Sequence, residues 1–200
     1  MEQRNKCAIR YVLSVSCLLL MFTWTAFGQE SELVVPDETE EGDFDFVSAE
    51  IQTLKSELDL NDLNRITLQQ EGNLNEAYIR QFSKTDPNLV KVHQKGSENY
   101  TDLYQNGNGN ATDIYQEGSG NSYWGEHVGN DIINIVYQEG DGNMIDQDLR
   151  ASDLDFQIYQ IGLGHELKQT ETRGGIGYKV TQDGWTGGMK IEIQQGNIYK

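Results

Sequence analysis

The sequence predicts an all-β protein, a two-sheet β-solenoid of strand–turn–strand coils, on three observations. The triplet Gln-x-Gly recurs eight times. From Gln94 to Gln182 the triplets are always 11 or 22 residues apart, and the segments between them alternate with period two. A fixed period is the signature of a repeat architecture, and period-two alternation is typical of strands with one buried face. The repeat therefore fixes the class of fold before any single motif is considered.

Each arm of the predicted coil is a seven-residue strand followed by a turn. Residues 110–116 are the clearest strand, and the next four, Glu117-Gly118-Ser119-Gly120, supply glycines for a tight reversal with positive φ. One arm takes 11 residues, so two arms form a coil of 22 residues. Twelve arms, which start between residues 64 and 188, predict about six coils within residues 63–200.

Positions 22 residues apart stack on each other, and the first of the two resulting sheets is strictly patterned. It carries an aliphatic column, a glutamine column and a glycine column. The aliphatic column is Leu68, Val92, Ile114, Val136, Ile158 and Val180. The glutamine column is Gln70, Gln94, Gln116, Gln138, Gln160 and Gln182, and the glycine column is Gly72, Gly96, Gly118, Gly140, Gly162 and Gly184. We expect the glutamine amides to bond to one another along the stack, because an unpaired buried amide would be costly.

The second sheet is patterned only in its first coils. Its first position holds Asn75, Asn99, Asn121 and Asn143. Its fifth position runs Ile79, Leu103, Gly125, Gln147, Gln169, Glu192, and its seventh runs Gln81, Gln105, His127, Leu149, Glu171, Gln194. In the last arm Met189, Ile191 and Ile193 alternate in the opposite phase to Gln194. A one-residue shift there, through a bulge, would restore an apolar inner face.

The segment before the repeats predicts export. Residues 1–28 have a basic start, an apolar middle and Ala26-Phe27-Gly28 at the end, which is the layout of a cleaved signal peptide. Both cysteines, Cys7 and Cys17, lie inside it, so we expect no disulfide in the mature chain. We also expect no transmembrane segment in the mature chain. Residues 29–62 are interpreted as an acidic linker, with a short helix in residues 48–60.

The net charge and the spacing of the reactive side chains exclude several classes of protein. Without residues 1–28 the chain keeps 12 basic and 31 acidic side chains, a net charge of −19, which repels nucleic acid. The three histidines, His93, His127 and His165, fall in different columns, without the spacing of metal ligands. No nucleophile and base stand at a fixed spacing. We therefore predict no enzyme, no cofactor and no metal site.

The repeats resemble those of the curlin family, whose repeat reads Ser-x5-Gln-x-Gly-x-Gly-Asn-x-Ala-x3-Gln. Residues 110–121 match this pattern with Asn110 in place of Ser, and residues 64–81 match both halves. The resemblance implies a subunit of a curli-like amyloid fibre that polymerises at the cell surface in adhesion and biofilm matrix. It also implies a curli-type secretion apparatus and a second curlin-like subunit as partners. Whether the chain is a major or a nucleating subunit is left open. The family's Ala position carries Thr101, Tyr123, Ile145 and Leu167, which predicts a wider interior.

An open solenoid has two edges with unpaired backbone groups, which globular proteins usually block. We expect one chain's last coil to template the first coil of the next, with the glutamine, glycine and asparagine columns as the ladders that continue. Glu117 and Glu139 stack in the turns, so acid or salt should speed assembly. The alternative is a monomeric secreted adhesin or a carbohydrate-binding surface protein.

Overall fold

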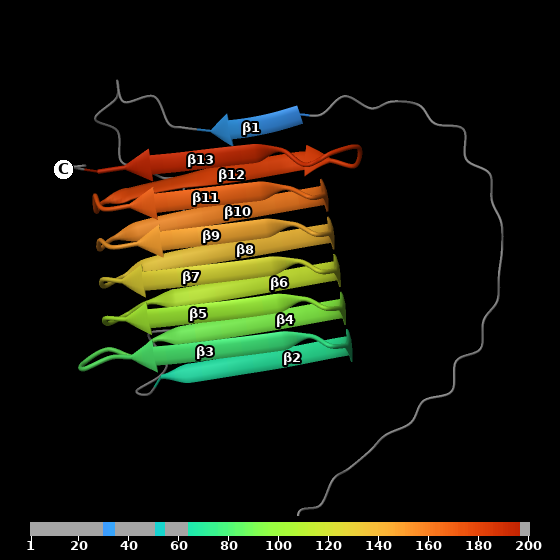
Figure 1. Cartoon of the computed structure of the whole chain (residues 1–200). Coiled ribbons are helices and arrows are strands. Elements are labelled where there is room, and N and C mark those ends of the chain that lie inside the picture. The colour runs from blue at the N-terminus through green and yellow to red at the C-terminus, as the bar shows by residue number, and fades with distance from the viewer. Residues whose placement is uncertain (1–29, 35–50, 55–63, 197–200) are drawn as a thin grey trace, which may run out of the picture.

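The computed structural model describes residues 30–34, 51–54 and 64–196, and residues 64–196 form a stack of two-strand coils (Figure 1). The first sheet has the order β1-β12-β10-β8-β6-β4-β2 and the second has the order β13-β11-β9-β7-β5-β3. The strands of the first sheet are β1 (Glu30–Val34), β2 (Arg65–Asn73), β4 (Leu89–Ser97), β6 (Ala111–Ser119), β8 (Ile132–Asp141), β10 (Leu154–Leu163) and β12 (Ile176–Gly184). Those of the second are β3 (Glu76–Phe82), β5 (Tyr100–Asn106), β7 (Ser122–Val128), β9 (Met144–Leu149), β11 (Glu166–Glu171) and β13 (Lys190–Gln195).

Each successive coil adds one parallel strand to each sheet, so the predicted two-sheet β-solenoid of about six coils is confirmed. In the first sheet Gln94 pairs with Gln116, and Gly96 with Gly118, in the predicted register. Apart from β1, the strands of this sheet are nine or ten residues long and run through the Gln-x-Gly triplet. The predicted turn over residues 117–120 begins later than expected, because β6 continues to Ser119, but Gly118 and Gly120 have the predicted positive φ.

The last arm is shifted by one residue, as its opposite phase predicted. Gln169 pairs with Ile193 and Glu171 with Gln195, so Glu192 and Gln194 do not belong to the inner columns. The shift follows from burial, because it brings Ile193 to 9% exposure and leaves the charged Glu192 outside.

The core lies between the two sheets and is continuous along the stack. Its largest buried side chains include Tyr123 and Phe156. The expected wider interior is not needed at Tyr123, because Gly125 of the same strand leaves space for the ring. A methyl group on Gly125 would lie 2.5 Å from the Tyr123 hydroxyl oxygen. A large side chain is therefore compensated by a missing one on the same strand.

Two segments N-terminal to the repeats contact the first sheet. β1 pairs antiparallel with β12 at the last-coil end of the stack (Figure 1). A helical turn at residues 51–54 buries Ile51 and Leu54 in a second apolar cluster, which also holds Leu89, Ala111, Ile133 and Ile135. These four residues lie on the outer face of the first sheet, so the helical turn covers that face rather than an end of the stack.

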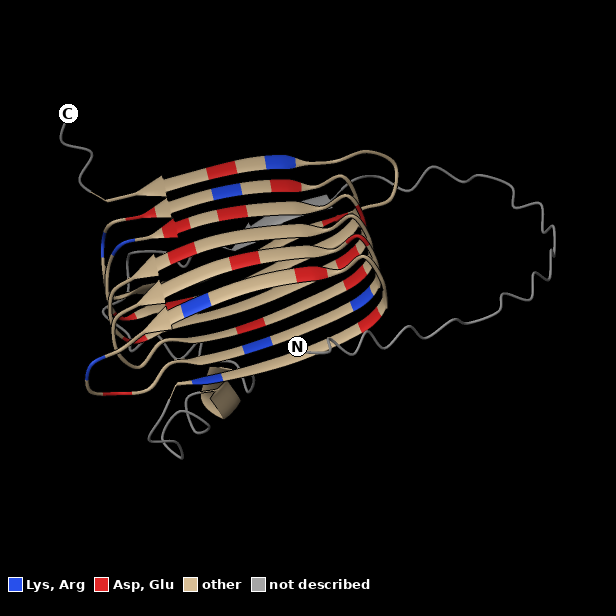
Figure 2. Cartoon of the chain, turned by 60° about the horizontal axis from the view of Figure 1, so that its bottom comes forward, with Lys and Arg blue, Asp and Glu red and all other residues tan. Residues whose placement is uncertain are grey.

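The surface of the described residues is acidic. Figure 2 shows acidic positions along the strands and turns, with few basic ones between them. Residues 1–28, where we predict the signal peptide, are not among the residues that the structure describes. In the described part of the chain, no helix has the length and apolar character needed to cross a membrane.

Candidate functional site

The glutamine column forms one directional hydrogen-bond ladder through the core. Each side-chain N–H donates to the side-chain oxygen of the next coil's glutamine. The five steps from Gln70 to Gln182 measure 2.6, 2.9, 2.8, 2.9 and 2.8 Å. The second N–H of each buried amide, from Gln94 to Gln182, donates across the core to a backbone carbonyl of the second sheet, as in the 3.0 Å bond from Gln116 to Tyr100 O. All polar atoms of these buried amides thus have partners, which a low-polarity core requires.

The ladder has two different ends. At the first coil, Gln70 donates to Gln94, and β2 is the outermost strand of its sheet. At the last coil, the N–H of Gln182 that would reach a next glutamine donates instead to Met189 O at 2.9 Å. The stack therefore has a polarity, with a glutamine oxygen facing one end and glutamine N–H groups facing the other.

The asparagine column of the second sheet forms a ladder of another kind. The oxygen of each side chain accepts the backbone N–H of the next coil's asparagine, at 3.0 Å from Asn99 to Asn75 and 3.1 Å from Asn143 to Asn121. The side-chain N–H₂ group bonds to the glycine carbonyl of the next coil, such as Gly140 O at 2.8 Å from Asn121. The asparagines therefore link neighbouring coils through hydrogen bonds to the backbone.

His165 continues the asparagine ladder where asparagine is absent. Its backbone N–H donates to Asn143 Oδ1 at 3.0 Å, and its Nδ1 accepts the backbone N–H of Met189 at 3.1 Å. Because Nδ1 is an acceptor, the proton is on Nε2, which donates to Ile161 O at 3.0 Å. The imidazole thus accepts the backbone N–H of the next coil, and it donates to the carbonyl four residues earlier as the Asn143 side chain does to Glu139 O.

We predict that His165→Asn is tolerated and that His165→Leu is not. Asparagine can restore the acceptor for Met189 N–H, so the free energy of unfolding should fall by less than in the leucine variant. Leucine leaves that N–H without its acceptor, which should cost about 1–3 kcal/mol. Urea unfolding followed by circular dichroism measures both, and equal midpoints for the two variants would contradict the assigned role.

The structure contains a third ladder, which was not predicted from the sequence. Asn64, Asn88 and Asn110 precede the strands of the first sheet. Asn88 N–H donates to Asn64 Oδ1 at 2.7 Å, and Asn110 N–H to Asn88 Oδ1 at 2.9 Å. The ladder ends where Ile132 N–H donates to Asn110 Oδ1. The signal was present, because asparagine stands at the first position of the first sheet's arms in three successive coils.

Two ionisable side chains interrupt the seventh column of the second sheet. His127 is fully buried, with its ring nitrogens 3.3 Å from Thr112 Oγ1 and 3.0 Å from the Tyr123 hydroxyl. Burial lowers the pKa of His127 to about 3. Glu171 accepts a hydrogen bond from the Tyr178 hydroxyl, and its Oε2 has no hydrogen-bond partner among the described residues. Burial raises the pKa of the Glu171 carboxyl. Both groups favour their neutral forms.

The outer faces carry aromatic and charged side chains. On the first sheet Tyr115 and Tyr137 stack with their ring centroids 5.1 Å apart, and their hydroxyls donate to Glu117 and Glu139. Glu117 also forms a 2.6 Å ion pair with Lys95, and these hydrogen bonds lower its pKa. The expected repulsion between Glu117 and Glu139 is therefore partly offset.

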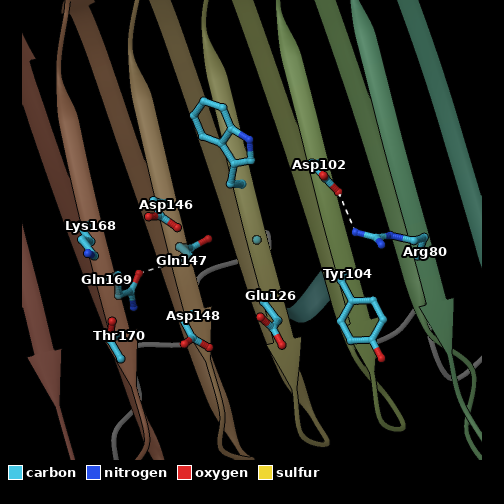
Figure 3. A pocket seen from close by; sticks show the side chains of 12 residues that line it. Arg80, Asp102, Tyr104, Glu126, Asp146, Gln147, Asp148, Lys168, Gln169 and Thr170 are labelled. Carbon is cyan, nitrogen blue, oxygen red and sulfur yellow. Dashed lines mark hydrogen bonds and ion pairs between the residues drawn. The ribbon is translucent and has the colours of Figure 1, made fainter.

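A shallow groove crosses the outer face of the second sheet (Figure 3). It is lined by Tyr104, Trp124 and Asp146, and Arg80 forms an ion pair with Asp102 at its end. Trp124 is 39% exposed. Within the described residues, no three His, Cys, Asp or Glu side chains are grouped to hold a metal ion.

Parallel coils, inward glutamine and asparagine ladders and a glycine column define the class of a structural β-solenoid. The family model of the curlin associated repeat matches residues 96–122, which span parts of two neighbouring coils. The match confirms the predicted resemblance of this part of the chain to the curlin family. This repeat family is structural rather than enzymatic. Neither the curated proteins nor the solved structures gave a significant match.

Proposed function

We propose that the protein is a structural subunit of an extracellular curli-like amyloid fibre, assembled end to end and serving cell adhesion and biofilm matrix. One observation carries the proposal: at the first coil, the inner side chains of the core are exposed to solvent. Ile66 and Leu68 occupy inner columns yet are each 47% exposed, whereas Val92 of the next coil is 2% exposed. Such an edge recruits another strand unless it is blocked.

The two ends of the stack are complementary. In the last coil, β12 carries Val180 and Gln182, which belong to the same columns as Leu68 and Gln70. A first coil docked onto a last coil would bring a glutamine oxygen to the Gln182 amide, as at every step inside the stack. No amide needs to reverse, and the Gln182 N–H exchanges its bond to Met189 O for one to the incoming glutamine oxygen. End-to-end addition therefore extends the core and the ladder with the geometry that the coils already have.

Location and partners belong to the same proposal. The signal-like residues 1–28 and the repeat family support secretion to the cell surface. A curli-type secretion apparatus and a second curlin-like subunit are the partners that this location implies. Electron microscopy of incubated protein tests the central claim, and a chain that stays monomeric at all concentrations would overturn it.

We predict that Leu68→Lys abolishes fibre elongation and leaves the monomer folded. The side chain is half exposed in the monomer, so lysine can extend its ammonium group into water. In a fibre the same charge would be buried without a partner, which costs several kcal/mol. Thioflavin fluorescence measures elongation from wild-type seeds.

Tyr78→Lys is the matched control, because Tyr78 lies in the same coil, is 54% exposed and belongs to an outer column. It should elongate at close to the wild-type rate. Equal elongation by both variants would show that the first coil is not the docking surface.

The groove on the second sheet favours a second candidate, binding of a neutral polysaccharide. Trp124 and Tyr104 offer aromatic surfaces beside the carboxylate of Asp146, a combination suited to the apolar face and hydroxyl groups of a sugar. Co-sedimentation with insoluble neutral polysaccharides tests it. A Trp124→Ala variant that sediments as well as the wild type would exclude this groove.

A further inference from the structure

The edge of β12 is already occupied by a strand of the same chain. β1 pairs with β12 over five positions, from Glu30 opposite Asp183 to Val34 opposite Lys179. This pairing is antiparallel, whereas β10 pairs with the other edge of β12 in parallel over nine positions. β1 therefore closes the first sheet at the end of the stack where a next coil would be added (Figure 1).

β1 fills this edge without continuing the columns. The residue opposite Gln182 is Ser31, so the glutamine ladder does not extend into β1. β2 of a second copy would offer nine positions in parallel register, with a glutamine, a leucine and a glycine at the matching places, as it does toward β4. β3 of that copy would pair with β13 at the same time, and among the described residues β13 is an outer strand of its sheet. The second copy thus pairs with more of the edge than β1 does.

We propose that the edge of β12 is an exchangeable strand-binding site, filled by β1 in the monomer and by β2 of a second copy in the fibre. The inference rests on the proposed function and adds its regulation. β1 competes with the incoming subunit, so elongation at this end requires β1 to leave. The first coil has no such cover from β1, which makes the two ends of the monomer unequal.

A reversible disulfide tests the proposal. Glu32 and Thr181 lie opposite each other in the register. Opposite Cα atoms in antiparallel strands are about 4.5–5.5 Å apart, within the range that a disulfide spans. The variant is the full chain with Glu32→Cys and Thr181→Cys, and with Cys7→Ser and Cys17→Ser to remove the native thiols. We expect the disulfide to close in the monomer, polymerisation to be lost when it is oxidised, and fibres to form after reduction.

A release variant tests the opposite direction. Replacement of residues 30–34 by Gly-Ser-Gly-Ser-Gly should raise the elongation rate on the order of tenfold, in proportion to the fraction of ends that β1 holds closed. The same replacement of residues 42–46 is the control, because it also removes two acidic and two apolar residues. It should leave the rate unchanged.

The outcomes separate the two proposals. Cysteines that do not pair in the monomer, or an oxidised variant that polymerises as fast as the reduced one, would overturn the exchange site and leave the fibre proposal standing. If the wild type and the reduced variant both stay monomeric, the fibre proposal fails and the exchange site fails with it.

Discussion

Replacing Gly140 by alanine is expected to lower the free energy of unfolding of the solenoid by about 4 kcal/mol or more. Losses of this size occur when the backbone cannot move to relieve a clash. A methyl group on Gly140 would lie 2.0 Å from the carbonyl oxygen of Gly162 in the next coil. The φ angle of Gly140 is +106°, which other residues rarely adopt. The clash is with backbone that is hydrogen-bonded within the stack, so relief would require neighbouring coils to separate.

Gly142, two residues further along the chain and directly after β8, provides the matched control. Its φ is +67°, and a methyl group there would meet nothing within 4 Å. Gly142→Ala should therefore cost only about 1–2 kcal/mol, the price of the left-handed conformation. Urea unfolding of the monomer compares the two, and equal losses would mean that contact between the coils does not restrict Gly140.

The glycine column explains why so much of this fold could be predicted. Gly96, Gly118 and Gly140 stand in register because each backbone meets the next one directly. Gln116 bonds to Gln138 for a related reason, since identical side chains in a parallel stack satisfy each other. Where the physical demand repeats in every coil, the residue repeats as well, and its spacing can be read from the sequence.

Features that occur once could not be predicted in this way. His165 takes over the asparagine ladder through its tautomer, and Gly125 makes room for Tyr123. Both are solutions to a local problem in one coil, so no period reveals them. β1 lies outside the repeats, and its pairing with β12 depends on a strand more than 140 residues later in the chain. Its antiparallel direction is also the reverse of every other pairing in the stack.

Acid should change the stability of the folded monomer through two buried groups, and their two effects have opposite signs. The pKa of His127 is lowered from 6.5 to about 3 by burial, so below pH 6.5 the unfolded chain binds a proton that the folded chain does not. Stability then falls as pH falls, by about 1.4 kcal/mol per pH unit, or about 3 kcal/mol at pH 4.5. The raised pKa of Glu171 acts in the other direction, because the folded carboxyl takes up its proton at a higher pH than the unfolded one. Stability from this group rises as pH falls through its folded pKa.

Two glutamine substitutions separate these contributions. His127→Gln restores the residue that Gln81 and Gln105 provide in the same column, and it should remove the loss of about 3 kcal/mol between pH 7 and pH 4.5. Glu171→Gln should raise stability at pH 7 and make the remaining loss on acidification steeper. His93→Gln is the control, because it changes a histidine of an outer column. Unfolding free energies at the two pH values measure all three, and a loss in His127→Gln as large as in the wild type would contradict the role of His127. Assembly that is still faster in acid would then have to arise from the surface, because the interior of the wild-type monomer becomes less stable.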